Sequence, residues 1–231
     1  MPDKYVQMRK NTVAADHQLK ETDYVHFYNL NGTGKKVMFV GNSITLHGIL
    51  PEIGWYGNWG MAASAEGNDY VHRLMASISQ LENDPVFCVC QVARWERNYK
   101  EGETVYPFFE NARKFNADII VMRFVENALV KEGEAPIFKE QMVKLLQYFD
   151  PEGKAEIILT TGFWHHPAEK AIAEAAEEMN WPLVELSDLG EQDEMKAIGL
   201  FEHGGVANHP GDLGMKMIAE RIFAVLKQYL A

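Results

Sequence analysis

Short apolar runs alternate along the chain with longer segments in which apolar residues recur every three or four positions. Short runs of this kind are typical of strands buried on both faces of a parallel sheet. They predict five strands, at residues 36–40, 86–92, 119–124, 156–160 and 183–186. The longer segments predict helices at residues 70–81, 108–115, 137–149, 168–179 and 213–230. This alternation favours a three-layer α/β/α sandwich around a central parallel sheet of about five strands.

The first 34 residues are more polar and end in a turn-like Asn-Gly-Thr-Gly. We interpret residues 1–34 as an N-terminal arm or extension, with an added strand at residues 24–28 as the alternative. Residues 35–231 then form the main domain, since they contain no repeat, low-complexity tract or linker.

Composition narrows the classes of function. The 231 residues carry a formal net charge of −11, which disfavours a nucleic-acid partner because phosphate binding depends on clustered cations. No apolar run approaches the ~20 residues that span a bilayer, and the N-terminus lacks the apolar core of a secretory signal. We therefore expect a cytoplasmic protein without a membrane partner. Cys88 and Cys90 share one face of a predicted strand, which suits buried free thiols better than a disulfide.

Candidate catalytic residues follow the predicted strands, because ligands of such folds bind beyond the carboxyl ends of the strands. Ser43 lies in Gly41-Asn42-Ser43, directly after the first strand of the main domain. Its position alone suits either a helix N-cap or a nucleophile. Of the eight histidines, His209 has the most suggestive context, in a rigid turn before the last helix. Asp212 in that turn is interpreted as the N-cap of this helix rather than as a catalytic acid.

Four segments resemble the signature blocks of the SGNH/GDSL hydrolases, in the family's order. Residues 37–45 resemble the strand that ends in Gly-Asp-Ser, and residues 58–64 resemble the second block. Residues 125–127 stand where the third block has Gly-x-Asn, and His209-Pro210 resembles the last block. The resemblance covers residues 35–231 and implies a flavodoxin-like SGNH-hydrolase fold and an ester hydrolase that requires no cofactor and no metal.

The resemblance also implies a role for each matching residue. Ser43 is the expected nucleophile and His209 the general base. The oxyanion hole would be formed by the backbone N–H of Ser43, a backbone N–H at Gly60 or Ala63, and the side-chain amide of Asn127. One such donor typically lowers the barrier by ~3–4 kcal/mol.

The chain departs from the family pattern at several positions. Asn42 replaces the Asp of the first block, and Val125 and Ala128 replace the residues that usually flank the block-three Asn. Val206 replaces the Asp that orients the histidine in the family. His209 must then act in a dyad held by a backbone carbonyl, or else borrow a carboxylate.

Glu202 and Glu126 are the candidate carboxylates for orienting His209.

Side chains near the strand ends suggest substrate classes. Three aromatic residues lie in the loop after Ser43 and a fourth follows the fourth strand: Trp55, Tyr56, Trp59 and Trp164. We expect them either to stack on the sugar rings of a substrate or to pack in the core. Three arginines also lie near the strand ends: Arg94, Arg97 and Arg123. We expect them either to bind an anionic group of a ligand or to form structural ion pairs within the protein.

We therefore expect a serine esterase for short-chain O-acyl esters, chiefly acetyl esters on a small molecule or carbohydrate. The alternatives are a lipase or thioesterase of the same fold and a non-catalytic carbohydrate-binding or scaffold domain.

Overall fold

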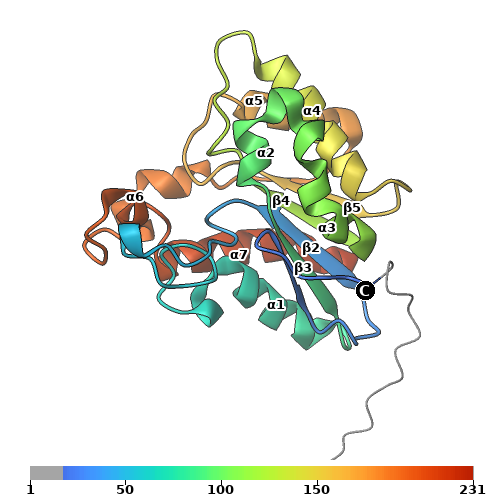
Figure 1. Cartoon of the computed structure of the whole chain (residues 1–231), viewed down its shortest axis with the longest axis horizontal. Helices are drawn as coiled ribbons and strands as arrows, with labels where there is room; N and C mark the ends of the chain where they lie inside the picture. Colours follow the sequence, from blue (N-terminus) through green and yellow to red (C-terminus); the bar gives the residue numbers. More distant parts are fainter. Residues whose placement is uncertain (1–17, 231) are drawn as a thin grey trace, which may run out of the picture.

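The computed structural model describes residues 18–230 and contains a six-stranded mixed sheet in the order β1-β3-β2-β4-β5-β6 (Figure 1). The strands are β1 (Val25–Tyr28), β2 (Lys36–Gly41), β3 (Val86–Gln91), β4 (Ile119–Arg123), β5 (Glu156–Thr160) and β6 (Leu183–Val184). The five predicted strands are confirmed, and β2 to β6 run parallel with the strand order of flavodoxin-like folds.

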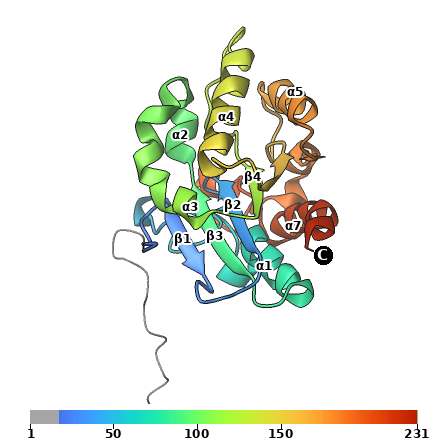
Figure 2. The ribbon, with the colours of Figure 1, turned by 90° about the vertical axis from the view of Figure 1, so that its right-hand side faces the viewer.

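Helices cover both faces of the sheet (Figure 2). The helices are α1 (Tyr70–Leu81), α2 (Ala93–Arg97), α3 (Glu110–Phe115), α4 (Ala135–Phe149), α5 (Glu169–Met179), α6 (Gly204–Ala207) and α7 (Asp212–Leu226). One apolar core lies between one face of the sheet and helices α1 and α7. The other lies between the opposite face and helices α2, α3, α4 and α5. Within residues 18–230, no helix has the length and hydropathy needed to cross a bilayer.

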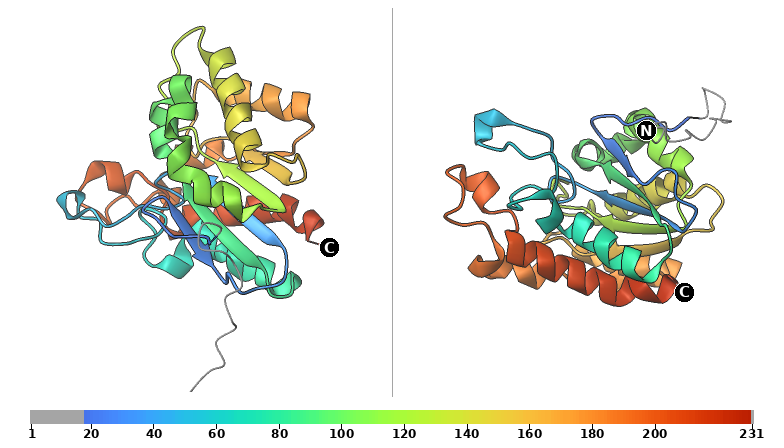
Figure 3. Two further views of the ribbon diagram at one scale, coloured as in Figure 1. Left: turned by 45° about the vertical axis from the view of Figure 1, so that its right-hand side comes forward. Right: turned by 90° about the horizontal axis from the view of Figure 1, so that it is seen from below.

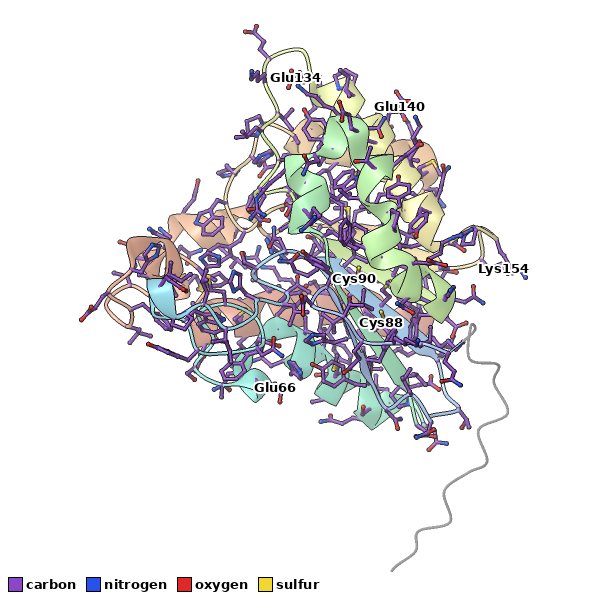
Figure 4. The ribbon with its side chains drawn as sticks, in the orientation of Figure 1. Glu66, Cys88, Cys90, Glu134, Glu140 and Lys154 are labelled. Atoms are coloured by element: carbon purple, nitrogen blue, oxygen red, sulfur yellow. The ribbon has the colours of Figure 1, made fainter. Side chains whose placement is uncertain are left out.

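Alternation along the strands explains why both faces are apolar. In β2, Val37 and Phe39 enter the core beneath α1 and α7, whereas Met38 and Val40 enter the opposite core. Cys88 and Cys90 of β3 point into the same core as Met38, as free thiols in the interior (Figure 4). Both faces of the parallel strands are therefore buried, in agreement with their unbroken apolar sequences.

The N-terminal extension contributes an edge strand to the sheet. β1 pairs with β3 in antiparallel orientation, from Val25 opposite Cys90 to Tyr28 opposite Phe87. The alternative of an added strand at residues 24–28 is confirmed, so this part of the extension packs with the main domain. Residues 1–17 of the predicted arm lie outside the described residues.

Two long loops extend from one side of the molecule, beyond the strand ends (Figure 3). The first follows β2 and contains a 3-10 turn, Pro51–Ile53; the second precedes α7 and contains α6. Their aromatic side chains meet, with the Trp55 and Phe201 ring centres 6.1 Å apart. The two loops therefore form one unit beside the site described next.

Candidate active site

Ser43 lies in a tight turn at the carboxyl end of β2. The backbone N–H groups of Thr45 and Leu46 both donate to the Asn42 carbonyl at 2.9 Å. Gly41 permits this turn, because a Cβ atom there would lie 1.7 Å from Thr45 Oγ1 and 2.7 Å from the Arg123 carbonyl oxygen. Ser43 starts no regular helix, so the N-cap interpretation is wrong.

The structure brings Ser43 and His209 together over 166 residues of sequence. Ser43 Oγ lies 2.8 Å from His209 Nε2, and His209 Nδ1 lies 2.7 Å from the Gly205 carbonyl oxygen. A carbonyl oxygen can only accept, so Nδ1 carries the proton and Nε2 presents its lone pair to the hydroxyl. This is the tautomer that a general base requires.

The Gly205 carbonyl is the hydrogen-bond partner that orients the His209 ring. It lies in the short helix α6, one helical turn before His209. Val206, at the position of the family's Asp, is fully buried in an apolar cluster with Trp55 and Met61. The cluster fixes α6 and so aims the carbonyl at the imidazole. Of the alternatives left open by the sequence, the backbone carbonyl is the one observed.

Neither of the two proposed carboxylates orients His209. Glu126 binds Asn42 and the Phe163 N–H, and Glu202 lines a separate cavity of about 630 Å³ between the two long loops. Asp212 is also reassigned: it is the first residue of α7, whose N-cap is Gly211, and its carboxylate accepts from Ser64.

The surroundings of His209 disfavour its charged form. Burial lowers its pKa to about 4, and electrostatic interactions with Arg123 and His47 act in the same direction. The Gly205 carbonyl opposes this shift, but it carries only a partial charge. Trp164 places its ring edge-on against the imidazole, with ring centres 5.8 Å apart. The imidazole is therefore neutral at neutral pH.

A buried polar network lies beneath Ser43. The Asn42 side-chain amide donates to Glu96 at 3.1 Å and to Glu126 at 2.5 Å, and its oxygen accepts from Arg123 at 3.2 Å. Arg123 also pairs with Glu126. Glu96 and Arg123 are fully buried, and burial raises the pKa of Glu96. This network explains Asn42, since an Asp would place a third carboxylate against two others.

The second-block loop packs against Ser43, but its two expected oxyanion donors are engaged elsewhere. The Gly60 N–H donates to Asp69 at 2.9 Å, and the Ala63 N–H donates to the Gly60 carbonyl at 3.2 Å. The loop is tied to the serine by Met61, whose N–H donates to the Ser43 carbonyl at 2.8 Å. The assignment of Gly60 or Ala63 as donor is therefore corrected.

The Ala62 N–H lies between these engaged groups and has no acceptor among residues 18–230, and neither has the Ser43 N–H. Ala62 adopts a φ of +75°, a strained conformation for a residue with a side chain. Asn127 is held by Glu96, which accepts from its side-chain amide at 2.8 Å. That amide has a second hydrogen, so one donor remains.

The expected aromatic residues divide between packing and exposure. Trp55 is buried and packs edge-on against Trp59, whereas Tyr56 is 69 % exposed. The structural interpretation therefore holds for Trp55. Among residues 18–230, no group of three His, Cys, Asp or Glu side chains is arranged to hold a metal ion.

Comparison with known proteins supports the fold. No family model and no curated protein matches the chain. Among solved structures, a two-domain esterase active on acetylated mannans matches with a TM-score of 0.56 at 15% identity, over 85% of this chain and 49% of its own. A family two carbohydrate esterase from Clostridium thermocellum, as an active-site mutant in complex with a cello-oligosaccharide, matches with a TM-score of 0.57 at 15% identity, over 84% and 63%.

A GDSL-like protein from Bacteroides uniformis matches with a TM-score of 0.53 at 13% identity, over 84% of this chain and 96% of its own. The chain spans about half to two thirds of the length of the two carbohydrate esterases. The chain therefore has the fold of the SGNH/GDSL hydrolases, as the sequence predicts.

Four residues of the site were missed by the sequence analysis: Ala62, Gly205, Glu96 and Asp69. Gly205 left a weak signal, because Gly204-Gly205 precedes His209 by one helical turn. Glu96 and Asp69 left none. Glu96 contacts Asn42, 54 residues away, and Asp69 contacts Gly60, nine residues away; neither spacing follows the period of a helix or a strand.

Proposed function

We propose that this protein is a serine esterase that removes short acyl groups, chiefly acetyl, from the hydroxyls of carbohydrates. The observation that carries the proposal is the 2.8 Å contact between Ser43 Oγ and His209 Nε2, with Nδ1 fixed as a donor by the Gly205 carbonyl. A serine without a base in this tautomer is a poor nucleophile. The arrangement therefore favours hydrolysis over a binding or scaffold role.

The reaction proceeds through an acyl-enzyme. His209 Nε2 accepts the Ser43 proton while Oγ forms a bond to the acyl carbon, and the carbonyl electrons move to its oxygen. When the tetrahedral intermediate collapses, the C–O bond to the alcohol breaks and the imidazolium protonates the leaving oxygen. A water molecule then adds to the acyl-enzyme by the same route, and the carboxylic acid leaves.

The oxyanion of this reaction needs donors that are not already engaged. The Ser43 N–H, the Ala62 N–H and the second amide hydrogen of Asn127 meet that condition. We assign the second-block role to Ala62, because the Met61–Ser43 hydrogen bond holds its loop against the nucleophile.

The substrate class has two supports. The fold is shared with an esterase active on acetylated mannans and with a carbohydrate esterase whose active-site mutant was solved in complex with a cello-oligosaccharide. The exposed Tyr56 lines the cavity between the two long loops together with Glu202 and His203. An aromatic face beside carboxylate and imidazole groups suits a sugar ring and its hydroxyls.

The test is hydrolysis of 4-nitrophenyl acetate, butyrate and octanoate by the wild type, Ser43→Ala and His209→Ala. Ser79→Ala, on the exposed side of α1, is the matched control. We expect the highest rate with acetate, a loss of about 10⁴-fold or more in kcat for both site variants, and no loss for the control. Turnover that survives Ser43→Ala would exclude this nucleophile, and a preference for octanoate would favour a lipase.

A further inference from the structure

The three arginines near the strand ends differ in what already holds their guanidinium groups. Arg123 is fully buried in the network beneath Ser43. Arg94 lies over the Phe108 ring, 4.3 Å from its centre. Arg97 is exposed, donates to Asn127 Oδ1 at 3.3 Å, and forms no ion pair with any residue of the described range 18–230. Of the three, Arg97 is the one available to a ligand.

Arg97 lines a cavity of about 360 Å³ at the start of the 3-10 segment Tyr99–Phe109, opposite the loop that follows β4. Two further cationic side chains, Lys100 and Lys131, line it together with one carboxylate, Glu101. Lys100 is held at 2.5 Å by Glu134, at the outer tip of the molecule in Figure 4. Of the three cations in the cavity wall, Lys100 is therefore neutralised by Glu134, whereas Arg97 and Lys131 can bind a ligand.

The charge of this wall is opposite to that of the protein as a whole. The chain carries a formal net charge of −11, whereas Arg97 and Lys131 face this cavity without an ion pair within residues 18–230. The cations of the wall outnumber its one carboxylate, Glu101, and a concave surface with an excess of positive charge concentrates anionic ligands. A guanidinium group presents paired N–H donors that match a carboxylate or phosphate.

The cavity adjoins the catalytic site through Asn127. The side-chain oxygen of Asn127 accepts from Arg97, while its amide nitrogen donates to Glu96 beneath Ser43. A group bound at Arg97 is thus one residue away from the proposed oxyanion hole. The volume is near the lower end of the range of small-molecule sites, about 300–1,000 Å³, and suits one sugar ring.

Resting on the proposed esterase function, we propose that this cavity binds an anionic group of the substrate, so that the preferred ester is carried by an acidic sugar. The anionic oxygens contact Arg97 and Lys131, and the exposed Leu129 covers an apolar edge of the ring. A sugar carboxylate and a sugar phosphate share this chemistry. The specificity of the enzyme would then be set by charge at a position remote from the ester.

Three substrates that differ only at C6 test the proposal: 3-O-acetyl glucose, 3-O-acetyl glucuronic acid and 3-O-acetyl glucose 6-phosphate. We expect kcat/KM for at least one anionic ester to exceed that for the neutral ester by about tenfold at low ionic strength. The preference should shrink as salt rises, because partly exposed charges are screened. The carboxylate and phosphate arms identify which anion the cavity prefers.

The readout in the variants is the ratio of kcat/KM for the anionic and neutral esters, because both esters use the same catalytic groups. Lys131→Gln and Arg97→Gln should each lower this ratio at least threefold, and Arg97→Lys should retain part of it. The matched control is Lys170→Gln, which makes the same charge change at a side chain that is 87% exposed on α5. The control should leave the ratio unchanged.

A binding measurement separates this proposal from the proposed function. Titration of Ser43→Ala with methyl glucuronoside, methyl glucoside or methyl glucoside 6-phosphate needs no turnover. Tighter binding of an anionic sugar that Lys131→Gln removes supports the subsite even if every ester is inert. Equal binding of all three sugars, or hydrolysis of the neutral ester with a ratio near one, overturns the subsite and leaves the esterase assignment intact.

Discussion

Replacing Asn42, next to Ser43, by the Asp of the SGNH/GDSL sequence pattern should destabilise this protein. Both amide hydrogens of Asn42 are donated to carboxylates, to Glu96 at 3.1 Å and to Glu126 at 2.5 Å. In Asn42→Asp these two hydrogen bonds become contacts between like charges in a buried site that contains one cation, Arg123.

Each hydrogen bond to a charged group contributes about 1.5–3 kcal/mol, and an uncompensated buried charge costs about 3–5 kcal/mol. We expect a loss of about 3–5 kcal/mol in the free energy of unfolding at pH 7.

The effect should depend on pH in a defined direction. Burial already raises the pKa of Glu96, and the added carboxylate raises it further. A carboxyl group with a raised folded pKa destabilises the protein above that pKa and ceases to do so as pH falls through it. The stability difference between the wild type and Asn42→Asp is therefore largest at neutral pH and narrows on acidification.

Urea unfolding at pH 7 and pH 5 measures both effects, and a compensating variant controls for shape. Asn42→Asp with Glu96→Gln returns the network to two carboxylates and one amide, so it should recover most of the lost stability. A loss below about 1 kcal/mol in the single variant, or a double variant no more stable than the single one, would refute the electrostatic account of Asn42.

The neutral His209 predicts that kcat/KM for 4-nitrophenyl acetate stays level from pH 8 to about 5 and falls with an apparent pKa of about 4, measured in stopped assays. Asp69→Asn keeps a good N-cap for α1 but removes the charged acceptor of the Gly60 N–H, which holds the second-block loop beside Ser43. Because this loop supplies a proposed oxyanion donor, we expect kcat to fall about tenfold with KM little changed. Gly41→Ala should lower stability by about 3 kcal/mol or more, seen as a lower Tm, because its Cβ has no room. Val206→Asp buries a carboxylate among aromatic side chains and should lower both Tm and activity; a rise in kcat would contradict the role given to the Gly205 carbonyl.

The layers of the fold were predictable because they depend on local pattern. Unbroken apolar runs identify strands buried on both faces, and the stripe of Phe138, Met142 and Phe149 identifies the buried side of α4. The strand order was implied only by the resemblance to a flavodoxin-like fold, because handedness and short connections limit the possible orders without selecting one. The position of Ser43 and His209 beyond the carboxyl ends of the strands follows from the α/β class alone.

The details of the site were not predictable because they depend on contacts of irregular loops, whose partners have no fixed spacing in the sequence. The Gly60 N–H is engaged by Asp69, which belongs to the start of α1, so the donor assignment for this loop was wrong. Likewise, the sequence gives no sign that the Asn127 side chain is already engaged: its amide nitrogen donates to Glu96, and its oxygen accepts from Arg97. Backbone hydrogen bonds of irregular loops leave no periodic trace, and their acceptors are side chains with no fixed spacing.

The two departures from the family's charged residues have one physical explanation. At Asn42 the usual carboxylate is replaced by an amide because Glu96 and Glu126 already supply negative charge there. At Val206 the usual carboxylate is replaced by an apolar side chain because α6 supplies a carbonyl to the imidazole and needs an apolar anchor. Each compensation comes from the three-dimensional surroundings of the substituted residue. The polar requirements of the serine and histidine are therefore met without the family's own acids, and restoring either acid alone would remove a fit that its neighbours have already made.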